Sequence, residues 1–415
     1  MAVVGSGVSG LTAAYLLRRT AHVTLFEASA RTGGHVHTHH TALPDGSTAV
    51  VDSGFIVCND QTYPTLLRLF AELGVSVRPT EMSMGIGCDG CGLQFVGGRG
   101  IRGIFAQRRR VADPRFWRFL LAVRRFQRLA LLHLADDVDS AESYGDFLAR
   151  HEFDDFFVNH YAVPVVSCVW SSGHDDALSY PAAYLFAFLD NHGFLRPREA
   201  PQWQVVAGGS SSYVDRILET LDRVETATQV TQLTRHESGV TLACSTGELG
   251  TFDAVVVATH ADEALGLLTD ATPTEKEVLG AFGYARNDAV LHRDESALPS
   301  NREARGGWNY RRASCRTRDE RVQVSYWMNR LQHHDEASPL VVTLNAAHAG
   351  SPGSVIAEMS YTHPIYTAAA RAAQHRLPEL DSDQVAFAGA YHGWGFHEDG
   401  CRAGAAAARR LGAEW

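Results

Sequence analysis

The order of apolar and polar positions at the start of the chain predicts a strand, a helix and a second strand. Residues 1–4 are apolar, residues 11–19 form an amphipathic helical pattern, and residues 22–26 are a second short apolar run. Short apolar strands around a helix are typical of a parallel sheet buried on both faces. Similar buried runs at residues 254–260 and 384–389 predict further strands of this sheet, so both ends of the chain are expected to meet there.

The middle of the chain predicts a second region with more helices. Residues 52–57 are expected to form a buried strand, residues 82–96 a hairpin that turns at Asp89–Gly90, and residues 162–171 an apolar turn. Helices are expected at residues 62–73, 114–132, 143–151, 181–189 and 213–221, and strands at residues 204–209, 308–310 and 322–328. Aromatic and aliphatic residues are dense between residues 156 and 170, which indicates the wall of an apolar cavity.

A glycine pattern joins the first strand to the first helix. Gly5 permits the tight turn, Gly7 lets the backbone approach a pyrophosphate, and Gly10 removes a side chain where helix and strand pack closely. Glu27 ends the second strand, where a carboxylate receives the ribose hydroxyls of adenosine and repels a 2′-phosphate. Residues 85–90 repeat the glycine spacing without a following helix, so the surrounding elements identify the dinucleotide site.

Residues 28–35 contain Arg31, Gly33, Gly34 and His35, and they resemble the segment that follows the second strand in the flavin-containing amine oxidase superfamily. In that family an Arg-x-Gly-Gly-Arg loop runs alongside FAD, and here His35 replaces the last arginine. The resemblance implies FAD rather than NAD as the cofactor. It also implies an α/β fold in which a Rossmann-like FAD-binding domain of the glutathione-reductase/amine-oxidase type is interleaved with an α+β substrate-binding domain. The expected ranges are 1–60, 204–286 and 384–415 for the first domain, and 61–203 and 287–383 for the second.

The end of the chain also resembles this family. Gly395, Phe396, His397 and Glu398 match its Gly-Tyr-x-Glu positions, and Asp399–Gly400 stand where the family has Gly-Ala. In the family a helix N-terminus here points at the flavin ring, and a helix is expected from about Cys401. The cofactor-binding residues expected from the motif and the resemblance are Gly5, Ser6, Gly7, Val8, Ser9, Gly10, Glu27, Ala28, Arg31, Gly33, Gly34, His35, Gly54, Phe55, Val230, Ala258, Gly389, Phe396, His397, Glu398, Asp399 and Gly400.

Over essentially the whole chain, the sequence resembles the predicted FAD-binding proteins associated with cyclopropane-fatty-acid synthases. The matching stretches are residues 52–57, 62–64, 115–117, 191–193, 326–332, 363–364, 389–391 and 395–400. The resemblance implies a redox role linked to lipids, with a lipid methyltransferase as a partner.

Two departures from the amine oxidase pattern argue against an amine oxidase activity. Amine oxidases carry a lysine near flavin N5, whereas the only lysine here, Lys276, does not match that position; Phe396 replaces an aromatic residue that bears a hydroxyl. Three hypotheses follow. The first is an FAD-dependent oxidoreductase that desaturates, saturates or isomerises a fatty-acyl chain by hydride transfer at N5. The second is an amine or amino-acid oxidase, and the third is a non-catalytic FAD-bearing partner of a lipid methyltransferase.

An acyl substrate needs an apolar channel and one base for an allylic proton. The candidate bases are His397, His192 and His260, with Tyr161 as a proton donor. The residues expected to contact the substrate are Trp170, Phe194, Tyr326, Trp394 and Phe396.

Two patterns suggest a metal site, but both favour a structural interpretation. Cys88 and Cys91 have the C-x-x-C spacing, yet no second pair exists and the pair does not open a helix. The histidines of residues 35–40 lie on the expected FAD loop, which favours packing against the cofactor. We therefore expect no metal ion.

Charge and cysteine content limit the partners and the compartment. The net charge of -10 argues against nucleic acid as a partner, and seven cysteines in a chain of this length resemble reduced cytosolic thiols. The start of the chain enters a strand directly and no apolar run is long enough for a bilayer, so we expect a cytoplasmic protein. Residues Arg99–Arg128 carry ten arginines and one acid, Asp113. This segment is interpreted as a peripheral contact with anionic lipid at the inner membrane face, or alternatively as a solvated basic face or a dimer contact.

Overall fold

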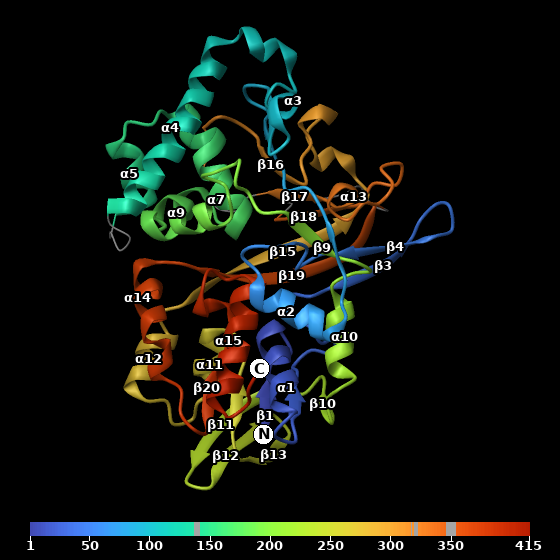
Figure 1. The fold of residues 1–415 in the computed structure, drawn as a ribbon, viewed down its shortest axis with the longest axis vertical. Coiled ribbons are helices and arrows are strands. Elements are labelled where there is room, and N and C mark those ends of the chain that lie inside the picture. The colour runs from blue at the N-terminus through green and yellow to red at the C-terminus, as the bar shows by residue number, and fades with distance from the viewer. Residues whose placement is uncertain (137–141, 317, 319–322, 346–353) are drawn as a thin grey trace.

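A five-stranded parallel sheet lies in the lower half of the molecule as drawn in Figure 1, a computed structural model that describes residues 1–136, 142–316, 318, 323–345 and 354–415. The strand order is β10 (Arg223–Glu225), β2 (Thr24–Phe26), β1 (Ala2–Val4), β14 (Val255–Val257) and β20 (Val385–Phe387). The sheet therefore brings together the beginning and the end of the chain, with β14 between β1 and β20, as the apolar runs predict.

Alternation along these strands divides the core between the two faces of the sheet. Val3 and Val256 pack on one face, and Val4 and Val257 on the other. Helices α1 (Val8–Leu17), α2 (Pro64–Leu73), α10 (Ser211–Leu218) and α15 (His397–Arg410) cover the first face. The second face is covered by α11 (Ala261–Leu267), α12 (Pro273–Leu279), α14 (Ala368–Arg376) and a sheet of β11 (Val230–His236), β12 (Gly239–Cys244) and β13 (Gly247–Phe252).

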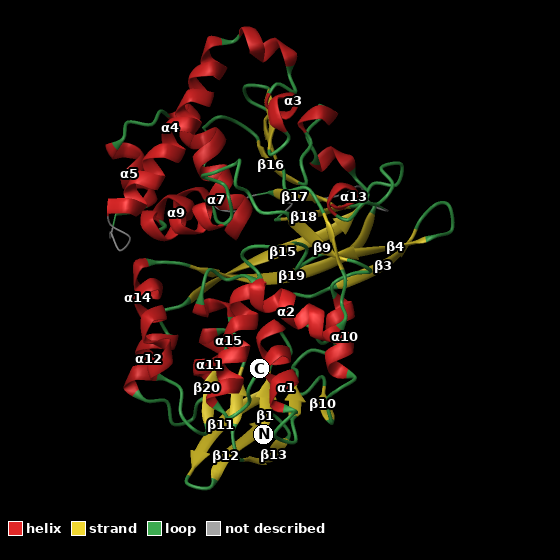
Figure 2. Cartoon of the chain, viewed as in Figure 1, coloured by secondary structure: helices red, strands yellow, loops and turns green. Residues whose placement is uncertain are grey.

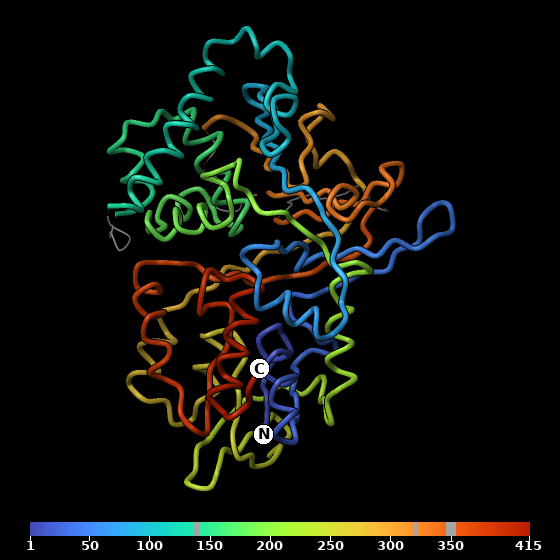
Figure 3. Tube along the Cα trace, viewed as in Figure 1, coloured from blue at the N-terminus to red at the C-terminus, as the bar shows by residue number. Residues whose placement is uncertain are grey.

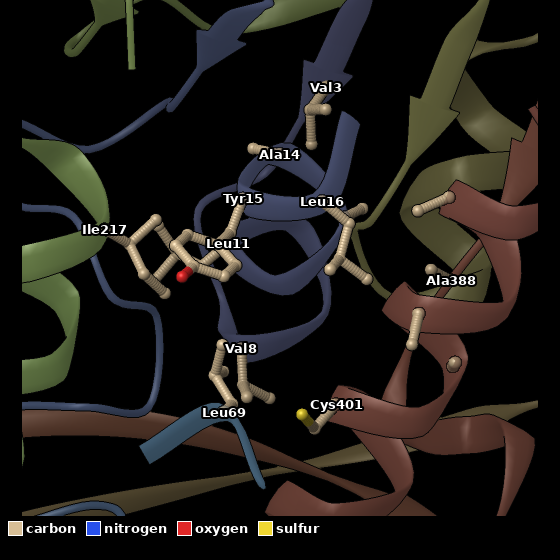
Figure 4. Close-up of a cluster of buried hydrophobic side chains, with 14 of the residues drawn as sticks. Val3, Val8, Leu11, Ala14, Tyr15, Leu16, Leu69, Ile217, Ala388 and Cys401 are labelled. Atoms are coloured by element: carbon tan, nitrogen blue, oxygen red, sulfur yellow. The ribbon is translucent and has the colours of Figure 1, made fainter. Parts of the chain in front are cut away.

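Glycines let α1 pack closely against α15 and against the loop that follows β1. A Cβ atom on Gly404 would lie 2.1 Å from the Ser9 carbonyl oxygen, and a Cβ on Gly10 would lie 1.9 Å from that of Gly5. Figure 4 shows α1 side chains between Ile217 of α10 and Cys401 of α15. The trace in Figure 3 likewise places the two ends of the chain side by side. Gly10 thus has the packing role that the glycine motif predicts.

A seven-stranded sheet lies above the parallel sheet, and its strands are antiparallel except where β16 meets β7 (Figure 2). Its order is β19 (Val355–Ile365), β15 (Gly283–His292), β18 (Val341–Leu344), β17 (Val324–Trp327), β16 (Trp308–Arg312), β7 (Met84–Cys88) and β8 (Leu93–Gly97). Smaller sheets pair β3 (Thr38–Ala42) with β4 (Thr48–Asp52), and β9 (Trp203–Val206) with β5 (Cys58–Asn59) and β6 (Val77–Pro79).

A layer of helices covers the other end of the molecule around an aromatic core. Its main helices are α4 (Pro114–Asp136), α5 (Tyr144–Arg150), α7 (Val163–Trp170), α8 (His174–Ser179) and α9 (Ala182–Asn191). Phe126 lies at the centre, with its ring 5.7 Å from the rings of Phe157 and Phe186. None of the helices among the described residues combines the length and hydropathy that crossing a bilayer requires.

Some local predictions differ from the structure. Residues 53–57 are not a strand, because β4 ends at Asp52 and the backbone at Gly54 packs against His35, whose carbonyl oxygen a Cβ would approach to 2.0 Å. Residues 163–170 are helix α7 rather than a turn. The strand expected at residues 204–209 is β9, and it pairs with β5 and β6. Helix α15 begins at His397, before the expected start. The domain boundaries stay predictions, although every strand of the parallel sheet comes from residues 1–60, 204–286 or 384–415.

Candidate cofactor and substrate site

A cavity of about 680 Å³ extends from the glycine loop to the helical layer. Segments that are distant in the sequence line it, including the ends of β1, β2 and β14 and the beginning of α15. The predicted site residues in its wall are Gly5, Ser6, Gly7, Val8, Ser9, Glu27, Ala28, Gly34, His35, Gly54, Phe55, Trp170, His192, Phe194, Val230, Ala258, His260, Tyr326, Gly389, Phe396 and His397. The fold thus brings most of the predicted residues to one space.

The glycine loop leaves the N-terminus of α1 open toward this cavity. Gly5 has φ +100, and a Cβ there would lie 2.7 Å from the Ala258 carbonyl oxygen. Gly7 is the N-cap residue of α1, no side chain caps the helix, and a Cβ on Gly7 would meet nothing within 4 Å. Uncapped N–H groups and the helix dipole favour an anion at this position.

Glu27 stands beside the glycine loop at the end of β2. Its Oε2 accepts hydrogen bonds from the backbone N–H of Ser6 at 3.0 Å and from the Ser6 hydroxyl at 2.5 Å. Its Oε1 accepts from the N–H of Ser29 at 2.8 Å. The carboxylate is therefore fixed at the edge of the cavity near Val230, and its binding of ribose stays a prediction.

The loop of residues 31–36 holds His35 in the wall. Arg31 donates from its guanidinium to the carbonyl oxygens of Gly34 (2.8 Å) and Val36 (2.5 Å), so it shapes the loop and does not line the cavity. His35 Nε2 lies 3.1 Å from the Thr362 carbonyl oxygen. Enclosure by the protein, and after it the neighbouring histidines, lower the pKa of His35 well below 6.5, so the ring is neutral.

The wall also contains residues that the sequence does not indicate, among them His363, Tyr361 and Tyr284. The ring of His35 lies 5.6 Å from that of His363 and 5.3 Å from that of Tyr361, and His260 stacks on Tyr284 at 4.4 Å. Enclosure lowers the pKa of His363 to about 4, and His260 adds to this effect. Residues 363–364 match the family resemblance, but no local pattern indicates that His363 lies beside His35.

The first turn of α15 is held by its own acidic residues. Asp399 Oδ2 accepts from the N–H groups of Trp394 (3.0 Å) and Phe396 (3.1 Å), and burial raises the pKa of this carboxyl group to about 6. Glu398 accepts from the N–H groups of residues 65 and 66, so it caps α2.

Gly400 packs against Val8, whose Cγ1 a Cβ would approach to 2.6 Å. Glu398, Asp399 and Gly400 therefore support the wall from behind and do not line it. Gly10 and Gly33 also lie outside the lining.

Aromatic side chains form the opposite end of the cavity. Phe396 stacks on Phe188 at 5.0 Å, and Trp170, Phe194 and Tyr326 complete this wall. Trp394 does not line the cavity, although its carbonyl oxygen accepts from Trp170 Nε1 at 3.1 Å.

Tyr161 does not line the cavity either. Its ring lies 6.0 Å from Phe126 and 5.5 Å from Phe157 in the helical core, and enclosure raises its pKa to about 12. The prediction that Tyr161 donates a proton at this site is therefore wrong, because π-helical residues 158–162 direct it into the helical layer.

Two of the three candidate bases differ in how their nitrogens are used. His192 Nδ1 lies 3.0 Å from the Phe188 carbonyl oxygen. That oxygen can only accept, so Nδ1 carries the proton and Nε2 carries the lone pair. His397 stacks on Phe55 at 3.8 Å, and its Nε2 lies 3.3 Å from the Tyr213 hydroxyl. Enclosure lowers the pKa of His192 to about 4 and that of His397 to about 3, so both rings are neutral near pH 7.

The third candidate base, His260, lies with His35 and His363, and its Nδ1 is 3.3 Å from the Thr362 hydroxyl. Acidic side chains are present only at this sheet end of the cavity, as Glu27 and Glu263 of α11. Lys276 lies in α12 and is not part of the described lining. The aromatic end is therefore uncharged.

The residues present fit an FAD. The open N-terminus of α1 and the free space at Gly7 suit a pyrophosphate, and Glu27 stands where adenosine is bound in such folds. The cavity continues from there past Gly54 and Phe396, which leaves room for a planar ring beside the first turn of α15.

Comparisons with known proteins agree with this fit. Residues 8–353 match the family described as flavin containing amine oxidoreductase. No curated protein matches the sequence.

Among solved structures, cyclohexylamine oxidase from Brevibacterium oxydans IH-35A is similar with 18% identity and a TM-score of 0.69, covering 99% of this chain and 98% of that one. The CLA-producing fatty acid isomerase from P. acnes has 16% identity and a TM-score of 0.66, with 97% and 96% covered. Putrescine oxidase bound to putrescine has 15% identity and a TM-score of 0.63, with 99% and 98% covered. At these identities the structures show a shared fold, and the family match carries the assignment. The chain belongs to the flavin containing amine oxidoreductases, and it is an FAD-dependent oxidoreductase.

Proposed function

We propose that the substrate is a fatty-acyl chain, which the enzyme desaturates, saturates or isomerises. The observation that carries this proposal is the uncharged aromatic end of the cavity, walled by Trp170, Phe188, Phe194 and Tyr326. An acyl chain has no charge at its reactive carbons, so burial of its methylene groups supplies the binding free energy, about 0.8 kcal/mol per group. Bound FAD would supply a two-electron acceptor of hydride for desaturation and, in its reduced form, a hydride donor for saturation.

An amine substrate suits this wall less well. An ammonium ion needs a carboxylate or an equivalent acceptor when it leaves water, because burying an unpaired charge is costly. The described lining offers carboxylates only at the sheet end, Glu27 and Glu263, and Glu27 already accepts three hydrogen bonds. The fatty acid isomerase that shares this fold supports the idea that the scaffold accepts an acyl chain.

Within this proposal His192 acts as the base that takes or returns an allylic proton. Its Nδ1 proton is held by the Phe188 carbonyl group, so Nε2 is an acceptor, and the ring forms part of the aromatic wall beside Phe396, at a ring distance of 5.9 Å. A fixed tautomer orients the lone pair without a charged partner.

An exposed face of α4 supports a lipid source for the substrate. Trp117, Leu121 and Leu132 are 46%, 64% and 52% exposed, and Arg124 and Arg128 are exposed between them. The spacing of these residues places all five on one side of the helix. Apolar residues interspersed with arginines match an anionic membrane surface. A lipid methyltransferase as the partner, which the family resemblance implies, is part of the same proposal.

The test is anaerobic mixing of candidate substrates with the oxidised flavoprotein and, for saturation, with the dithionite-reduced flavoprotein. The readouts are the flavin absorbance and the mass and double-bond positions of the product. Olefinic and saturated fatty acids and phospholipids are expected to bleach the flavin or to be isomerised by it, whereas cyclohexylamine and putrescine are not. Rapid bleaching by an amine with release of peroxide in air would contradict the proposal and establish an amine oxidase. A flavin that none of these compounds reduces, with every acyl chain returned unchanged, would indicate a non-catalytic partner.

A substitution at His192 tests the base. His192→Phe keeps an aromatic ring against Phe188 and removes Nε2. We expect turnover of the acyl substrate to fall about 100-fold, the scale of general base catalysis, with the flavin content and absorbance spectrum unchanged. His375→Phe, at an exposed position on α14, is the matched control. Unchanged turnover in His192→Phe would exclude His192 as the base.

A further inference from the structure

Four potential metal ligands meet at one edge of the seven-stranded sheet, outside the cavity. They are Cys88, Cys91, His160 and Cys315, and their ligand atoms all lie within 4.8 Å of one another. The sequence suggests that Cys88 and Cys91 lack further ligands. That expectation is wrong, because β16 brings Cys315 beside β7 and the π-helical residues 158–162 bring His160 over the hairpin.

We propose that these residues form a tetrahedral zinc site of the Cys3His type. The Sγ atoms of Cys88 and Cys315 are 3.7 Å apart, and Cys91 Sγ lies 3.5 Å from His160 Nε2. With Zn–S bonds of about 2.3 Å and Zn–N bonds of about 2.0 Å, a tetrahedron has S–S edges of about 3.8 Å and S–N edges of about 3.5 Å. These two edges therefore have the lengths of an occupied site, and a shift of less than about 1 Å brings all six within range.

The imidazole of His160 is oriented for a metal ligand. Its Nδ1 lies 2.8 Å from the Phe156 carbonyl oxygen, which can only accept, so Nδ1 carries the proton and Nε2 presents its lone pair to the cysteines. The ring also stacks on Phe156 at 4.2 Å. Histidines that bind a metal through one ring nitrogen characteristically donate a hydrogen bond from the other nitrogen, which fixes the tautomer.

The hairpin loop that follows Cys88 and contains Cys91 is shaped for close approach to Cys315. This loop spans residues 89–92, so it is longer than the two-residue turn that the sequence predicts. A Cβ on Gly90 would lie 2.9 Å from the Cα of Ser314, and Gly92 has φ +64 directly after Cys91. Two cysteines separated by two residues on a turn are the spacing of structural zinc sites.

Arginines surround the cluster and match its expected charge. A Zn²⁺ ion with three thiolates and one neutral imidazole carries one net negative charge. The buried guanidinium of Arg312 donates to Asn159, which precedes His160, and to the carbonyl oxygen of Ser314 at 2.8 Å. Arg110 donates to the carbonyl oxygen of Cys91 at 3.3 Å. Part of the arginine-rich segment therefore stabilises this site.

The ligand set and the place of the site in the fold indicate a structural role for the zinc ion. All four coordination positions are filled by protein atoms, which leaves no open position for a substrate. The ligands come from the hairpin β7–β8, from the helical layer and from the end of β16, so the ion ties the sheet to the helices that carry Trp170.

The experiment measures zinc in the full-length flavoprotein, purified with a reductant and without chelators from cells supplied with zinc. Elemental analysis is expected to give about one zinc per chain. Cys91→Ser and Cys315→Ser are expected to lose it, whereas Cys244→Ser and Cys168→Ser, which change half-buried and buried cysteines outside the cluster, keep it. Zinc in wild type at less than about a tenth of the chain concentration, or kept in both cluster variants, would overturn the proposal.

Thiol protection in the wild-type protein provides a readout that does not depend on folded variants. In native buffer Cys244 is expected to react with iodoacetamide, and Cys88, Cys91 and Cys315 only after a strong chelator is added. Cobalt exchanged into the protein is expected to give the intense visible bands of a tetrahedral thiolate site. A disulfide between Cys88 and Cys315 in the purified, unreduced protein, or cluster thiols that react equally with and without chelator, would show that no ion is held there.

Discussion

At Gly7 the fold leaves room for a side chain, whereas the expected pyrophosphate does not. Its φ of -66 suits any residue, and a Cβ there would touch nothing within 4 Å. Gly5 and Gly10 differ, because a side chain at either position collides with backbone. A substitution at Gly7 therefore tests the pyrophosphate position without disturbing the packing of α1.

We predict that Gly7→Ala folds normally but binds FAD about 10-fold more weakly, because a Cβ displaces a phosphate that contacts the backbone. The measurements are the melting temperature of the apoprotein and the dissociation constant of FAD from fluorescence quenching. Gly283→Ala is the control, since its Cβ also meets nothing within 4 Å and it lies outside the cavity. Equal FAD affinity in both variants would contradict the proposed position of the pyrophosphate.

The sequence identifies residues whose role is local and misses those whose role depends on distant partners. Gly5, Gly10 and Glu27 lie within one strand–helix–strand unit, so a short motif predicts them. His363 and Cys315 have neighbours from distant parts of the chain: His363 lies beside His35, and Cys315 follows β16, which pairs with β7. A lone histidine or cysteine in the sequence gives no sign of such a neighbour.

Helices and strands with a clear hydrophobic period, or with proline or glycine at their ends, are predicted well. Helix α2 begins at Pro64 and ends at Gly74 in the left-handed conformation, as the sequence predicts. Helix α7 was missed because residues 162–170 are nearly all apolar, and a continuous apolar run carries no helical period. A short apolar run likewise predicts a strand at residues 53–57. The structure has no strand there, because Gly54 packs too closely against His35 to be part of a sheet.

Helix α4 carries a prediction about membranes. Replacing both Arg124 and Arg128 by Gln is expected to reduce binding to vesicles containing phosphatidylserine about 30-fold, because each arginine near an anionic surface contributes about 1 kcal/mol. Vesicle co-sedimentation at low salt measures the effect. The control replaces Arg198 and Arg409, which are exposed on other surfaces. If the wild-type protein does not bind these vesicles, the arginine face of α4 is simply solvated.

For the whole molecule, the family and the meeting of the two chain ends were both accessible from sequence, because the glycine motif and the C-terminal segment are long and ordered. The course of the chain between them was harder to predict. Residues 203–206 are as apolar as the strands of the parallel sheet, yet they pair with β5 and β6. Competition between equally apolar partners is decided by tertiary packing, which a single sequence does not display.

Enclosed neutral histidines predict a loss of stability in acid. The pKa of His192 and of His392 is lowered to about 4, and that of His397 to about 3, in each case mainly by enclosure. Below about pH 6.5 the unfolded chain binds protons that the folded chain does not, so the stabilisation present above pH 6.5 is lost as the pH falls toward 4. Asp399 acts in the opposite direction, because its raised pKa favours the folded state at low pH, but it is one group against several.

We therefore expect the melting temperature to fall between pH 7 and pH 5, with each such histidine losing roughly 2 kcal/mol at pH 5. The variant His392→Phe, outside the cavity, should show a smaller fall than the wild type, and the exposed-site variant His375→Phe should not. Differential scanning fluorimetry across this range measures both. A melting temperature that is constant from pH 7 to pH 5 would mean that these rings are protonated in the folded state.

The pairing of β1 with β14 and of β14 with β20, together with the packing of α1 against α15, has a consequence for biosynthesis. During translation β1 and α1 emerge long before residues 385–410, which contain β20 and α15. Until then the side of α1 that packs against α15 has no permanent neighbour, which favours engagement by chaperones. Capture of the flavin is thus expected to follow release from the ribosome, and nascent chains stalled before residue 385 should remain colourless.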